Sequence, residues 1–408
     1  MFQRFFPLAA SLALAAAPHA DVLLVDGAGG PGAFIGIQGA ILAASEGDTI
    51  VVEEGDYAEF EVVGKSLSIV AEEGALVRIV GAFTSLTAPL EVRDLAADQS
   101  VTVRGLVVYP DAISSGEPAV QLRDNAGVVL LEDVQVEAYE NWSSQGLLVE
   151  DCDAVILSRC SFLSGQCVTP CPGGRIADSS VSLYDTSFVG SEGIPGSLFA
   201  PVSAGGAGLS LSVSSVFAAG CSFTGGQGGP AEAFECQAAA GDGFDLGSST
   251  AVLRDCVLSP GQPGEGGLQD PPCPDPAGEA LTSMGGTLQE LTGEARSFEA
   301  TPLVREGELL VETFTGPPDD FVFLAFAGAL EPAFLPAVAG DFALAAPFGI
   351  AFKGQLDASG TLVDPVPIGE LGPGVLASQV RFQAIHLTAV GAAFVSGPSS
   401  TVLLDGSL

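Results

Sequence analysis

The chain has 408 residues, of which 50 are Asp or Glu and 13 are Lys or Arg, so its formal charge at neutral pH is −37. A surface this acidic repels nucleic acid, anionic lipid and polyanionic polysaccharide. Hydrophobic residues make up 47% of the chain, which is too many for an acidic disordered protein and predicts a fold with a large core.

Residues 1–20 have the pattern of a secretory signal peptide. Arg4 precedes an apolar run over residues 8–17, and small residues offer cleavage after Ala17 or Ala20. The run is too short to span a bilayer, and no later stretch reaches the roughly 20 uninterrupted apolar residues that a transmembrane helix needs. We therefore expect a secreted, extracellular or cell-surface protein whose mature chain has no transmembrane segment.

The segment from Phe34 to Tyr57 predicts a cap for the end of a solenoid. It begins with a short amphipathic helix, in which we expect Ile37, Ile41 and Leu42 on one face, and it continues through Gly47-Asp-Thr-Ile50 into a first strand. This pattern resembles the N-terminal segment of secreted right-handed parallel β-helix proteins of the pectin-lyase-like superfamily. The resemblance covers residues 33–300 and implies a fold more strongly than an activity.

A repeat of eight residues follows, with apolar residues mostly at positions one, three, six and eight. Positions four and five are polar or turn-prone, so the pattern describes two short strands that meet at a corner. The sixth positions are 26 to 35 residues apart, which is the length of one solenoid coil. These sixth positions are Leu106, Val134, Cys160, Thr186, Cys221 and Cys256.

A third alternating strand precedes the pair in most coils. Its copies are Leu90–Val92, Val120–Leu122, Leu147–Val149, Leu209–Leu211 and Phe244–Leu246. Strands that stack on their counterparts in the next coil rise by about 4.8 Å per coil. The sequence therefore predicts an all-β fold, a right-handed parallel β-helix with three strands per coil, over residues 21–300.

Equivalent positions of successive coils should form inward-facing columns, two of which are distinctive. The first should stack as an aromatic ladder made of Phe162, Phe188 and Phe223, with Val136 and Leu258 at its ends. The second contains Cys160, Cys221 and Cys256. A reactive thiol or metal cluster is one interpretation of the second column, but we favour small core residues because the positions face inward.

The remaining cysteines lie outside these columns. Cys167 and Cys171 fall in one loop among Gly and Pro, and Cys236 and Cys273 fall in later loops after the same corner. In an exported protein these are candidate disulfides, most simply Cys167 with Cys171 and Cys236 with Cys273. Cys152 is either free or paired with a neighbour.

After residue 300 the coils give way to longer alternating runs separated by turns rich in Gly, Pro and Asp. The runs are Glu308–Phe314, Asp320–Phe326, Gly349–Leu356 and Ser378–Ile385. This pattern predicts an antiparallel β-sandwich over residues 301–408. The boundary is expected within the Gly- and Pro-rich stretch Ser259 to Gly278 or shortly after it, between residues 295 and 305.

The sequence lacks the catalytic motifs that the resemblance would bring, among them Asn-Thr-Asp, Gly-His-Gly and Arg-Ile-Lys. Lyases of this fold need a basic residue beside a uronate carboxylate, but Arg104, Arg159 and Arg254 do not share one corner position in adjacent coils. His386 is the only His outside the signal peptide, and a lone His favours a structural role. We therefore assign no catalytic residue and no cofactor.

Carboxylates are the remaining candidates for chemistry. One Asp lies two residues after the last inward residue of the third strand in each of four successive coils: Asp94, Asp124, Asp151 and Asp178. We favour a turn residue repeated once per coil, because Asp suits tight bends. The alternative is an acidic row that binds Ca²⁺, or an acid and base for glycan hydrolysis drawn from Asp124, Asp151 and Asp153.

Two function hypotheses remain. The first is a secreted or surface-associated, non-catalytic scaffold or glycan-contacting rod, whose partner is an extracellular polysaccharide or a cell surface. The second is a polysaccharide-active enzyme, either a glycoside hydrolase or a lyase, that uses carboxylates on the β-helix face. Tyr139 and Trp142 are candidate ligand contacts because an exposed aromatic pair suits sugar stacking; a loop folded over the helix explains them equally well.

Overall fold

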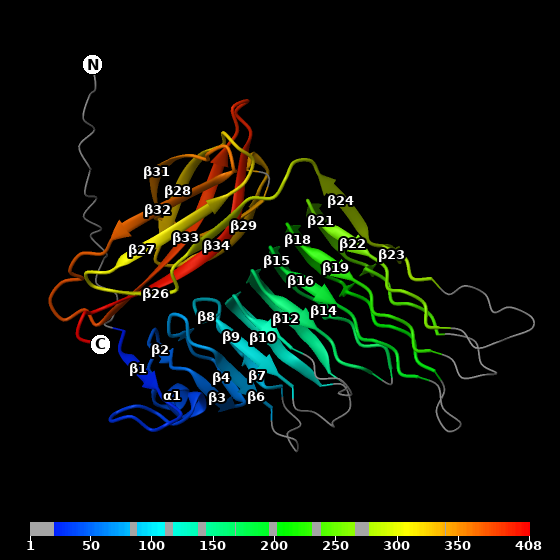
Figure 1. Cartoon of the computed structure of the whole chain (residues 1–408), viewed down its shortest axis with the longest axis horizontal. Coiled ribbons are helices and arrows are strands. Elements are labelled where there is room, and N and C mark those ends of the chain that lie inside the picture. The colour runs from blue at the N-terminus through cyan, green and yellow to red at the C-terminus, as the bar shows by residue number, and fades with distance from the viewer. Residues whose placement is uncertain are drawn as a thin grey trace, which may run out of the picture.

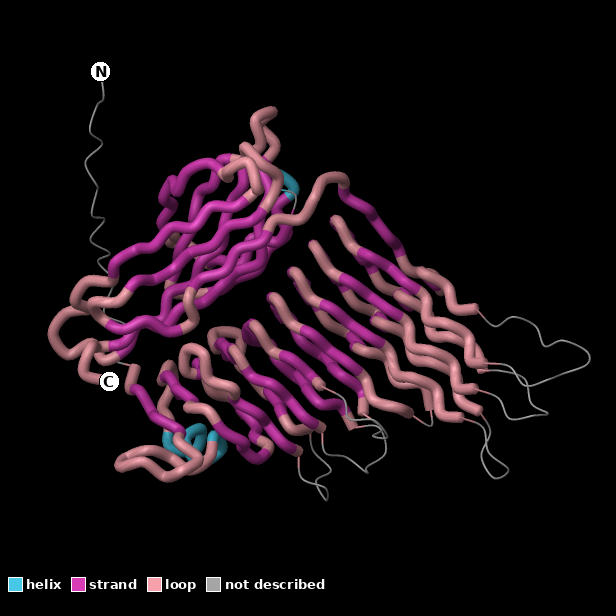
Figure 2. The backbone as a smooth tube through the Cα atoms, in the orientation of Figure 1, coloured by secondary structure: helices cyan, strands magenta, loops and turns pink. Residues whose placement is uncertain are grey.

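The computed structural model describes residues 20–408 except 82–87, 111–116, 138–143, 168, 196–201, 231–237, 266–276 and 339. It contains a long stack of parallel strands and, over one of its faces, a second group of strands (Figures 1 and 2). No helix in this part of the chain is long and apolar enough to cross a membrane. Several predicted features lie outside the described residues, namely the predicted signal peptide except Ala20, the aromatic pair Tyr139 and Trp142, and the cysteines Cys236 and Cys273.

The stack is a parallel β-helix in which each full coil contributes one strand to each of three rows. The first row contains β4 (Phe60–Val63), β7 (Leu90–Arg93), the first halves of β10 (Pro118–Glu132) and β12 (Gln145–Ser158), β14 (Gly174–Ala177), β17 (Leu209–Ser212), β20 (Phe244–Leu246) and β23 (Leu281–Ser283). Each strand pairs in parallel with its counterpart in the next coil, as β7 does with β4 and β10. The prediction of three strands per coil is confirmed.

The middle row begins where β1 (Val22–Val25) pairs with the first coil strand. It contains β2 (Thr49–Val52), β5 (Leu67–Ala71), β8 (Ser100–Arg104), the second halves of β10 and β12, β15 (Ser180–Tyr184), β18 (Ser215–Ala219), β21 (Thr250–Arg254) and β24 (Thr287–Leu291). The third row forms a separate sheet of β3 (Gly55–Ala58), β6 (Val77–Val80), β9 (Leu106–Tyr109), β11 (Gln135–Val136), β13 (Ser161–Leu163), β16 (Ser187–Val189), β19 (Ser222–Thr224) and β22 (Val257–Ser259).

The aromatic ladder is confirmed inside the third row. Ring centroids of Phe162 and Phe188 are 5.1 Å apart and those of Phe188 and Phe223 are 5.7 Å apart, with planes 19° and 15° from parallel. Phe244 of the first row adds an edge-on ring 5.1 Å from Phe223. All four rings are fully buried, so the ladder is a large apolar contribution to the solenoid core.

The cap is the helix α1 (Ile37–Ala43), which buries Ile37, Ala40 and Ile41 against the first coil. The prediction for Leu42 is wrong, because its side chain is 75% exposed. At roughly 100° per residue, Leu42 lies about 140° around the helix from Ile37, whereas Ile41 lies about 40° away.

Most corners between strands depend on one residue in the left-handed region. Four corners between the first and middle rows use the predicted aspartates, with φ between 46° and 60°, and the next coil uses Val213 with φ of 51°. The corners between the middle and third rows use Gly105, Asp133, Arg159, Asp185, Gly220 and Asp255. Gly adopts positive φ freely, and Asp is among the few other residues that adopt it readily, which explains why the fifth position of the repeat is so often Gly or Asp.

Beyond the third row, the Gly-rich segments of the later coils form a two-layer slab. Hydrogen bonds within one layer repeat every three residues, as in Gly190 N to Thr224 O and Gly193 N to Gln227 O. Between the layers, backbone amides donate to backbone carbonyls in a continuous series. Each residue of the series donates to the one named before it: Cys171, Ser191, Gly206, Gly226, Gly241 and Gly261. Three residues per turn is the period of an extended polyproline-type helix. The predicted disulfide between Cys167 and Cys171 is confirmed at the start of this slab.

The residues after 296 form two sheets and a hairpin. One sheet contains β25 (Ser297–Ala300), β27 (Leu309–Thr315) and β32 (Thr361–Pro367), and the other contains β26 (Leu303–Arg305), β34 (Ala393–Leu404), β33 (Ala377–Leu387), β28 (Phe321–Ala327) and β31 (Gly349–Gln355). Their inner faces share one apolar cluster that includes Phe298, Phe314 and Phe382. The hairpin is β29 (Leu330–Leu335) and β30 (Gly340–Leu344), joined through η1 (Pro336–Val338). That residues 301–408 fold as a separate sandwich domain stays a prediction.

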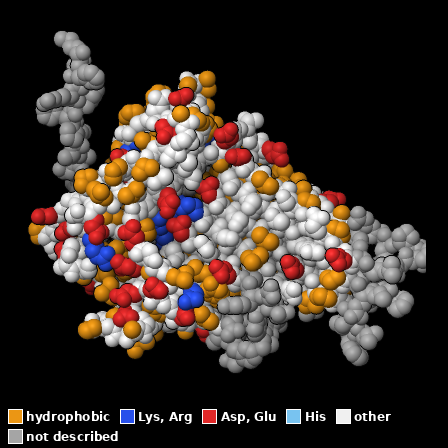
Figure 3. Space-filling view, viewed as in Figure 1, with side chains coloured by type: hydrophobic (Ala, Val, Ile, Leu, Met, Phe, Trp, Pro, Cys, Tyr) orange, Lys and Arg blue, Asp and Glu red, His pale blue; other side chains and the backbone are white. Residues whose placement is uncertain are grey.

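These C-terminal strands cover the outer face of the middle row. Outward side chains Leu130, Ile156 and Phe217 belong to one cluster with Val395 and Phe342 of the C-terminal strands. A second cluster, near the N-terminal end, joins outward valines of β2 and β5 to strands β26, β33 and β34. The space-filling view shows the two parts in contact, with acidic side chains scattered over the visible surface (Figure 3).

Candidate functional site

The four aspartates of the predicted row are corner residues. Asp94, Asp124, Asp151 and Asp178 have φ values of 60°, 55°, 52° and 46°. Asp94 accepts a hydrogen bond of 2.6 Å from its neighbour Arg93. Within the described residues, no group of three or more His, Cys, Asp or Glu side chains is placed to hold a metal ion. The row therefore supplies the conformation of the bend, and Ca²⁺ binding by it stays a prediction.

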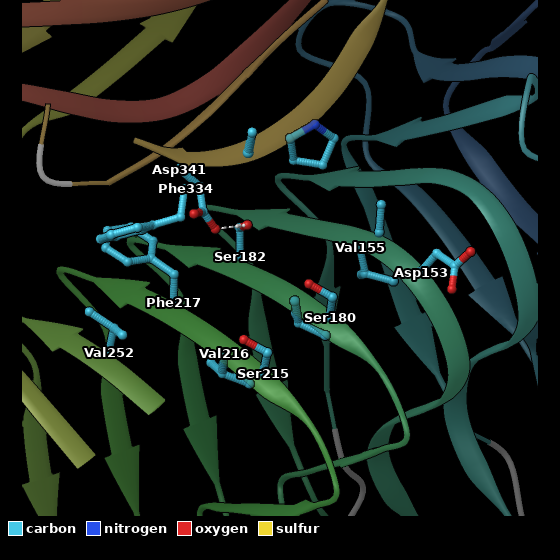
Figure 4. A pocket seen from close by; sticks show the side chains of 14 residues that line it. Asp153, Val155, Ser180, Ser182, Ser215, Val216, Phe217, Val252, Phe334 and Asp341 are labelled. Carbon is cyan, nitrogen blue, oxygen red and sulfur yellow. Dashed lines mark hydrogen bonds between the residues drawn. The ribbon is translucent and has the colours of Figure 1, made fainter. Parts of the chain in front are cut away.

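Asp153, two residues beyond the corner, lies in a different place. It lines a cleft of about 280 Å³ between the outer face of the middle row and the hairpin β29–β30. The floor of this cleft comes from β12, β15, β18 and β21, and its roof comes from the hairpin (Figure 4). Asp341 of β30 is the second carboxylate in its lining.

Serine hydroxyls make up much of the floor. Val181 and Leu183 of β15 point into the β-helix core, so the alternation of the strand turns Ser180 and Ser182 outward. Ser215 pairs with Ser180 in the next coil and also faces out. Figure 4 shows these three side chains between Asp153 at one end of the cleft and Asp341 at the other.

Aromatic rings close the end of the cleft beside Asp341. The rings of Phe217 and Phe334 are 6.0 Å apart at 53°. Phe217 is buried, whereas Phe334 remains 44% exposed at the edge of the hairpin. Tyr184 supports Phe217 from behind with ring centroids 5.7 Å apart, and its hydroxyl donates to Asp341 O at 2.7 Å.

Asp341 is held firmly and stays partly desolvated. The Ser182 hydroxyl donates to its carboxylate, and Gln383 Nε2 donates to its backbone carbonyl at 2.9 Å. Burial raises the pKa of the Asp341 carboxyl above its ordinary value, while the Ser182 hydrogen bond acts in the opposite direction. Among the described residues that line the cleft, two are carboxylates and none is cationic.

The corner arginines have structural partners. Arg104 and Arg159 come from different positions of the repeat, yet both contact Glu132 and Asp133 in the coil between them. Arg254 stacks on the Phe394 ring, with its guanidinium 4.8 Å from the ring centroid. None of the three lines the cleft, so they do not supply a base to it.

The described thiols and the histidine do not line the cleft either. Cys152, Cys160 and Cys221 are buried free thiols, and burial raises the pKa of Cys160 to about 12. Cys152, for which pairing was left open, is free. His386 is fully buried, and burial together with the nearby Arg296 lowers its pKa to about 3. These groups are neutral at physiological pH, and none of them supplies a nucleophile or base to the cleft.

Sequence reasoning therefore found one of the cleft residues and missed most. Of Asp124, Asp151 and Asp153, only Asp153 lines the cleft. Asp341 and Phe334 were missed because a hairpin far along the chain carries them, and no local pattern indicates where that hairpin docks. The signal that could have been used is the pair of outward serines in β15, of which Ser180 stays exposed and Ser182 is buried against Asp341.

Comparisons with known proteins identify distant structures only. The sequence matches no protein family and no curated protein. One similar solved structure is the enzymatically active domain of tailspike protein 2 of bacteriophage CBA120, with 10% identity and a TM-score of 0.25 over 96% of this chain and 77% of that one. The corresponding domain of tailspike protein 4 has 12% identity and a TM-score of 0.23 over 87% and 64%. Likenesses this distant say nothing about what this chain binds.

Proposed function

We propose that this protein is a secreted or surface-associated β-helix scaffold that contacts an uncharged extracellular polysaccharide through the cleft and does not cleave it. The observation that carries the proposal is the combination of an exposed aromatic ring, a row of hydroxyls and a carboxylate in one cleft. Phe334, Ser180, Ser215 and Asp153 supply these groups.

The chemistry of these groups suits a sugar ring. The apolar C–H face of a sugar can pack on the exposed Phe334 ring, while its hydroxyls bond to serine hydroxyls and donate to the Asp153 carboxylate. Ligand sites typically combine apolar and aromatic surface with a few placed polar groups. The polar groups here come from rigid strands, which fixes their spacing.

The charge of the chain and the volume of the cleft restrict the class of ligand that can bind. A chain of formal charge −37, with carboxylates but no cation among the described cleft residues, disfavours uronates and sulfated sugars. A volume of about 280 Å³ is just below the roughly 300–1,000 Å³ typical of pockets that enclose small ligands. We therefore expect the cleft to contact a short stretch of a neutral chain rather than to enclose a small molecule.

Binding of neutral and acidic oligosaccharides to the purified protein, measured by calorimetry, tests the proposal. Phe334→Ala should weaken neutral-glycan binding by about tenfold, which corresponds to about 1.4 kcal/mol of lost ring contact. Phe348→Ala is the matched control, because that ring is 43% exposed and packs on one other ring, 5.1 Å away. Equal losses in both variants, or no binding across a broad neutral panel, would contradict the proposal.

The second candidate is a glycoside hydrolase that works in the same cleft. One observation favours it: burial raises the pKa of Asp341 while Asp153 stands at the other end of the cleft (Figure 4), and hydrolysis uses a protonated and an ionised carboxyl. Release of reducing ends from a neutral polysaccharide that disappears in both Asp341→Asn and Asp153→Asn would establish this enzyme. Binding without release supports the scaffold.

A further inference from the structure

Two cysteines of the inward column lie side by side in adjacent coils. Ala219 pairs with Arg254 and Ser222 pairs with Val257, so the register places Cys221 beside Cys256. The corner residues Gly220 and Asp255 share a left-handed conformation, with φ of 68° and 49°, so the chain turns alike on both sides of the pair.

This placement satisfies the distance that a disulfide needs. Neighbouring strands lie about 4.7–4.9 Å apart, within the roughly 4.4–6.8 Å Cα separation of disulfides. The Cys256 thiol reaches back to the coil that holds Cys221, where it donates to Ala218 O at 3.5 Å, and the Cys221 thiol donates to Ala219 O at 3.4 Å. Both cysteines are free.

The third cysteine of the column has no such neighbour. Cys160 stacks on Thr186 in the next coil, whose hydroxyl accepts a hydrogen bond from the Cys160 amide at 3.3 Å. Thr186 therefore separates Cys160 from Cys221 by a whole coil. Within this column, only one pair of cysteines can be joined without moving the backbone.

We propose that Cys221 and Cys256 are a site of oxidative modification, where thiol–disulfide exchange with an external disulfide joins adjacent coils and secures the last strand of the third row. That strand is β22, the end of its sheet. Its residue Val257 is 60% exposed, and a sheet edge of this kind opens more readily than an interior strand.

The two thiols differ in a way that orders the reaction. Cys256 is half-buried, and the neighbouring Cys221 side chain lowers its thiol pKa, whereas burial raises the pKa of Cys221. The Cys256 thiolate attacks one sulfur of a small disulfide, RSSR, and RS⁻ leaves. Cys221 then loses its proton to solvent and attacks the Cys256 sulfur of the mixed disulfide, releasing the second RS⁻. Two protein thiols are oxidised and one RSSR is reduced to two RSH.

The bond would close a loop of one coil, from residue 221 to residue 256. A cross-link of this kind restricts the unfolded chain and stabilises the folded one, provided that the native geometry accepts it. The slab segment that begins at Gly261 follows β22 directly in the chain. A cross-link that holds β22 in place therefore also holds the start of this segment.

The test uses the full mature chain incubated with glutathione disulfide, alkylated under denaturing conditions and mapped by mass spectrometry. We expect a cross-linked peptide pair containing Cys221 and Cys256, and an apparent Tm raised by several degrees. Cys160→Ser, the control in the same column, should form the same cross-link. Mapping by peptide distinguishes this pair from every other cysteine of the chain.

Two further variants keep the proposal falsifiable. Cys221→Ser should stop at a glutathione adduct on Cys256, since the resolving thiol is absent. Cys256→Ser, at the less buried position, should give neither adduct nor cross-link at this site. A stable adduct on Cys256 in the unaltered protein, a cross-link to Cys160, or a cross-link that lowers Tm would overturn the proposal.

Discussion

Arg104 and Glu132 form a buried ion pair at the contact between the β-helix and β34, with Nη1 and Oε1 3.0 Å apart. Glu132 is fully buried, and its carboxylate also accepts hydrogen bonds from Arg159 at 2.5 Å and from the hydroxyls of Ser399 and Ser400 at 2.5 Å and 2.8 Å. Arg104 Nη2 donates to Ala300 O at 2.6 Å. Outward side chains of the middle row thus bind the C-terminal strands.

Replacing Glu132 with Gln should lower the free energy of unfolding by about 1–3 kcal/mol, because it removes one of the two carboxylates that Arg104 and Arg159 share and leaves Asp133 as their remaining anionic partner. Urea denaturation measures the change. Asp56→Asn is the control, since Asp56 pairs with Arg78 at 2.7 Å on the surface, where the two side chains are 61% and 43% exposed. That variant should change stability by less than about 1 kcal/mol. Similar effects in both would show that the buried pair does not join the two parts.

The glycine slab gives a second prediction. A Cβ on Gly226 would stand 1.8 Å from Ser191 O, a contact that only movement of the backbone can relieve. We expect Gly226→Ala to destabilise the protein by about 2 kcal/mol or more. Gly328→Ala is the control, because nothing lies within 4 Å of a Cβ there. Melting curves compare the two, and a Gly226→Ala melting temperature equal to that of Gly328→Ala would contradict the two-layer packing.

The inward half of the β-helix could be predicted from the sequence because it repeats. Alternation of period two and a fixed corner position place Phe162, Phe188 and Phe223 in one column without knowledge of any contact. The slab could not be found in this way, because a three-residue period of glycines carries no hydrophobic signal. The sequence shows its segments only as Gly- and Pro-rich connections.

The outward half could not be predicted, because its partners are far away in the chain. Ser182 and Asp341 are 159 residues apart, yet they form the hydrogen bond at the base of the cleft. Phe217 is an outward residue by alternation and would be expected in solvent, but the hairpin buries it. Tertiary docking, which local patterns do not encode, decides which outward residues become a site.

Substitutions at Asp151 test whether this residue serves as a turn residue or as a metal ligand. With φ of 52°, Asp151→Gly should keep stability within about 0.5 kcal/mol, whereas Asp151→Val should cost about 1–2 kcal/mol, because a β-branched residue resists this conformation. Thermal melts with Ca²⁺ or with a chelator complete the experiment. Equal Tm values in both buffers support the turn role, and a Ca²⁺-dependent rise in Tm that Asp151→Gly abolishes would support the acidic row instead.

His386 should make the protein sensitive to acid. Its pKa is about 3 in the folded chain and 6.5 without burial, so between these values the unfolded state binds a proton that the folded state does not. Stability from this group is therefore complete above pH 6.5 and is lost as the pH falls toward 3, by about 1.4 kcal/mol per pH unit. Buried carboxyls with raised pKa values, such as Asp341 and Glu312, have the opposite effect on stability, because the folded state binds their protons more tightly and gains stability as the pH falls.

A variant isolates the histidine from these carboxyls. Neither ring nitrogen of His386 has a hydrogen-bond partner among the described residues, so His386→Leu should be tolerated at neutral pH. Urea denaturation between pH 7 and pH 4 should then show a difference in unfolding free energy that moves in favour of the variant as the pH falls. A difference that stays constant across this range would mean that His386 takes up its proton equally in the folded and unfolded chains.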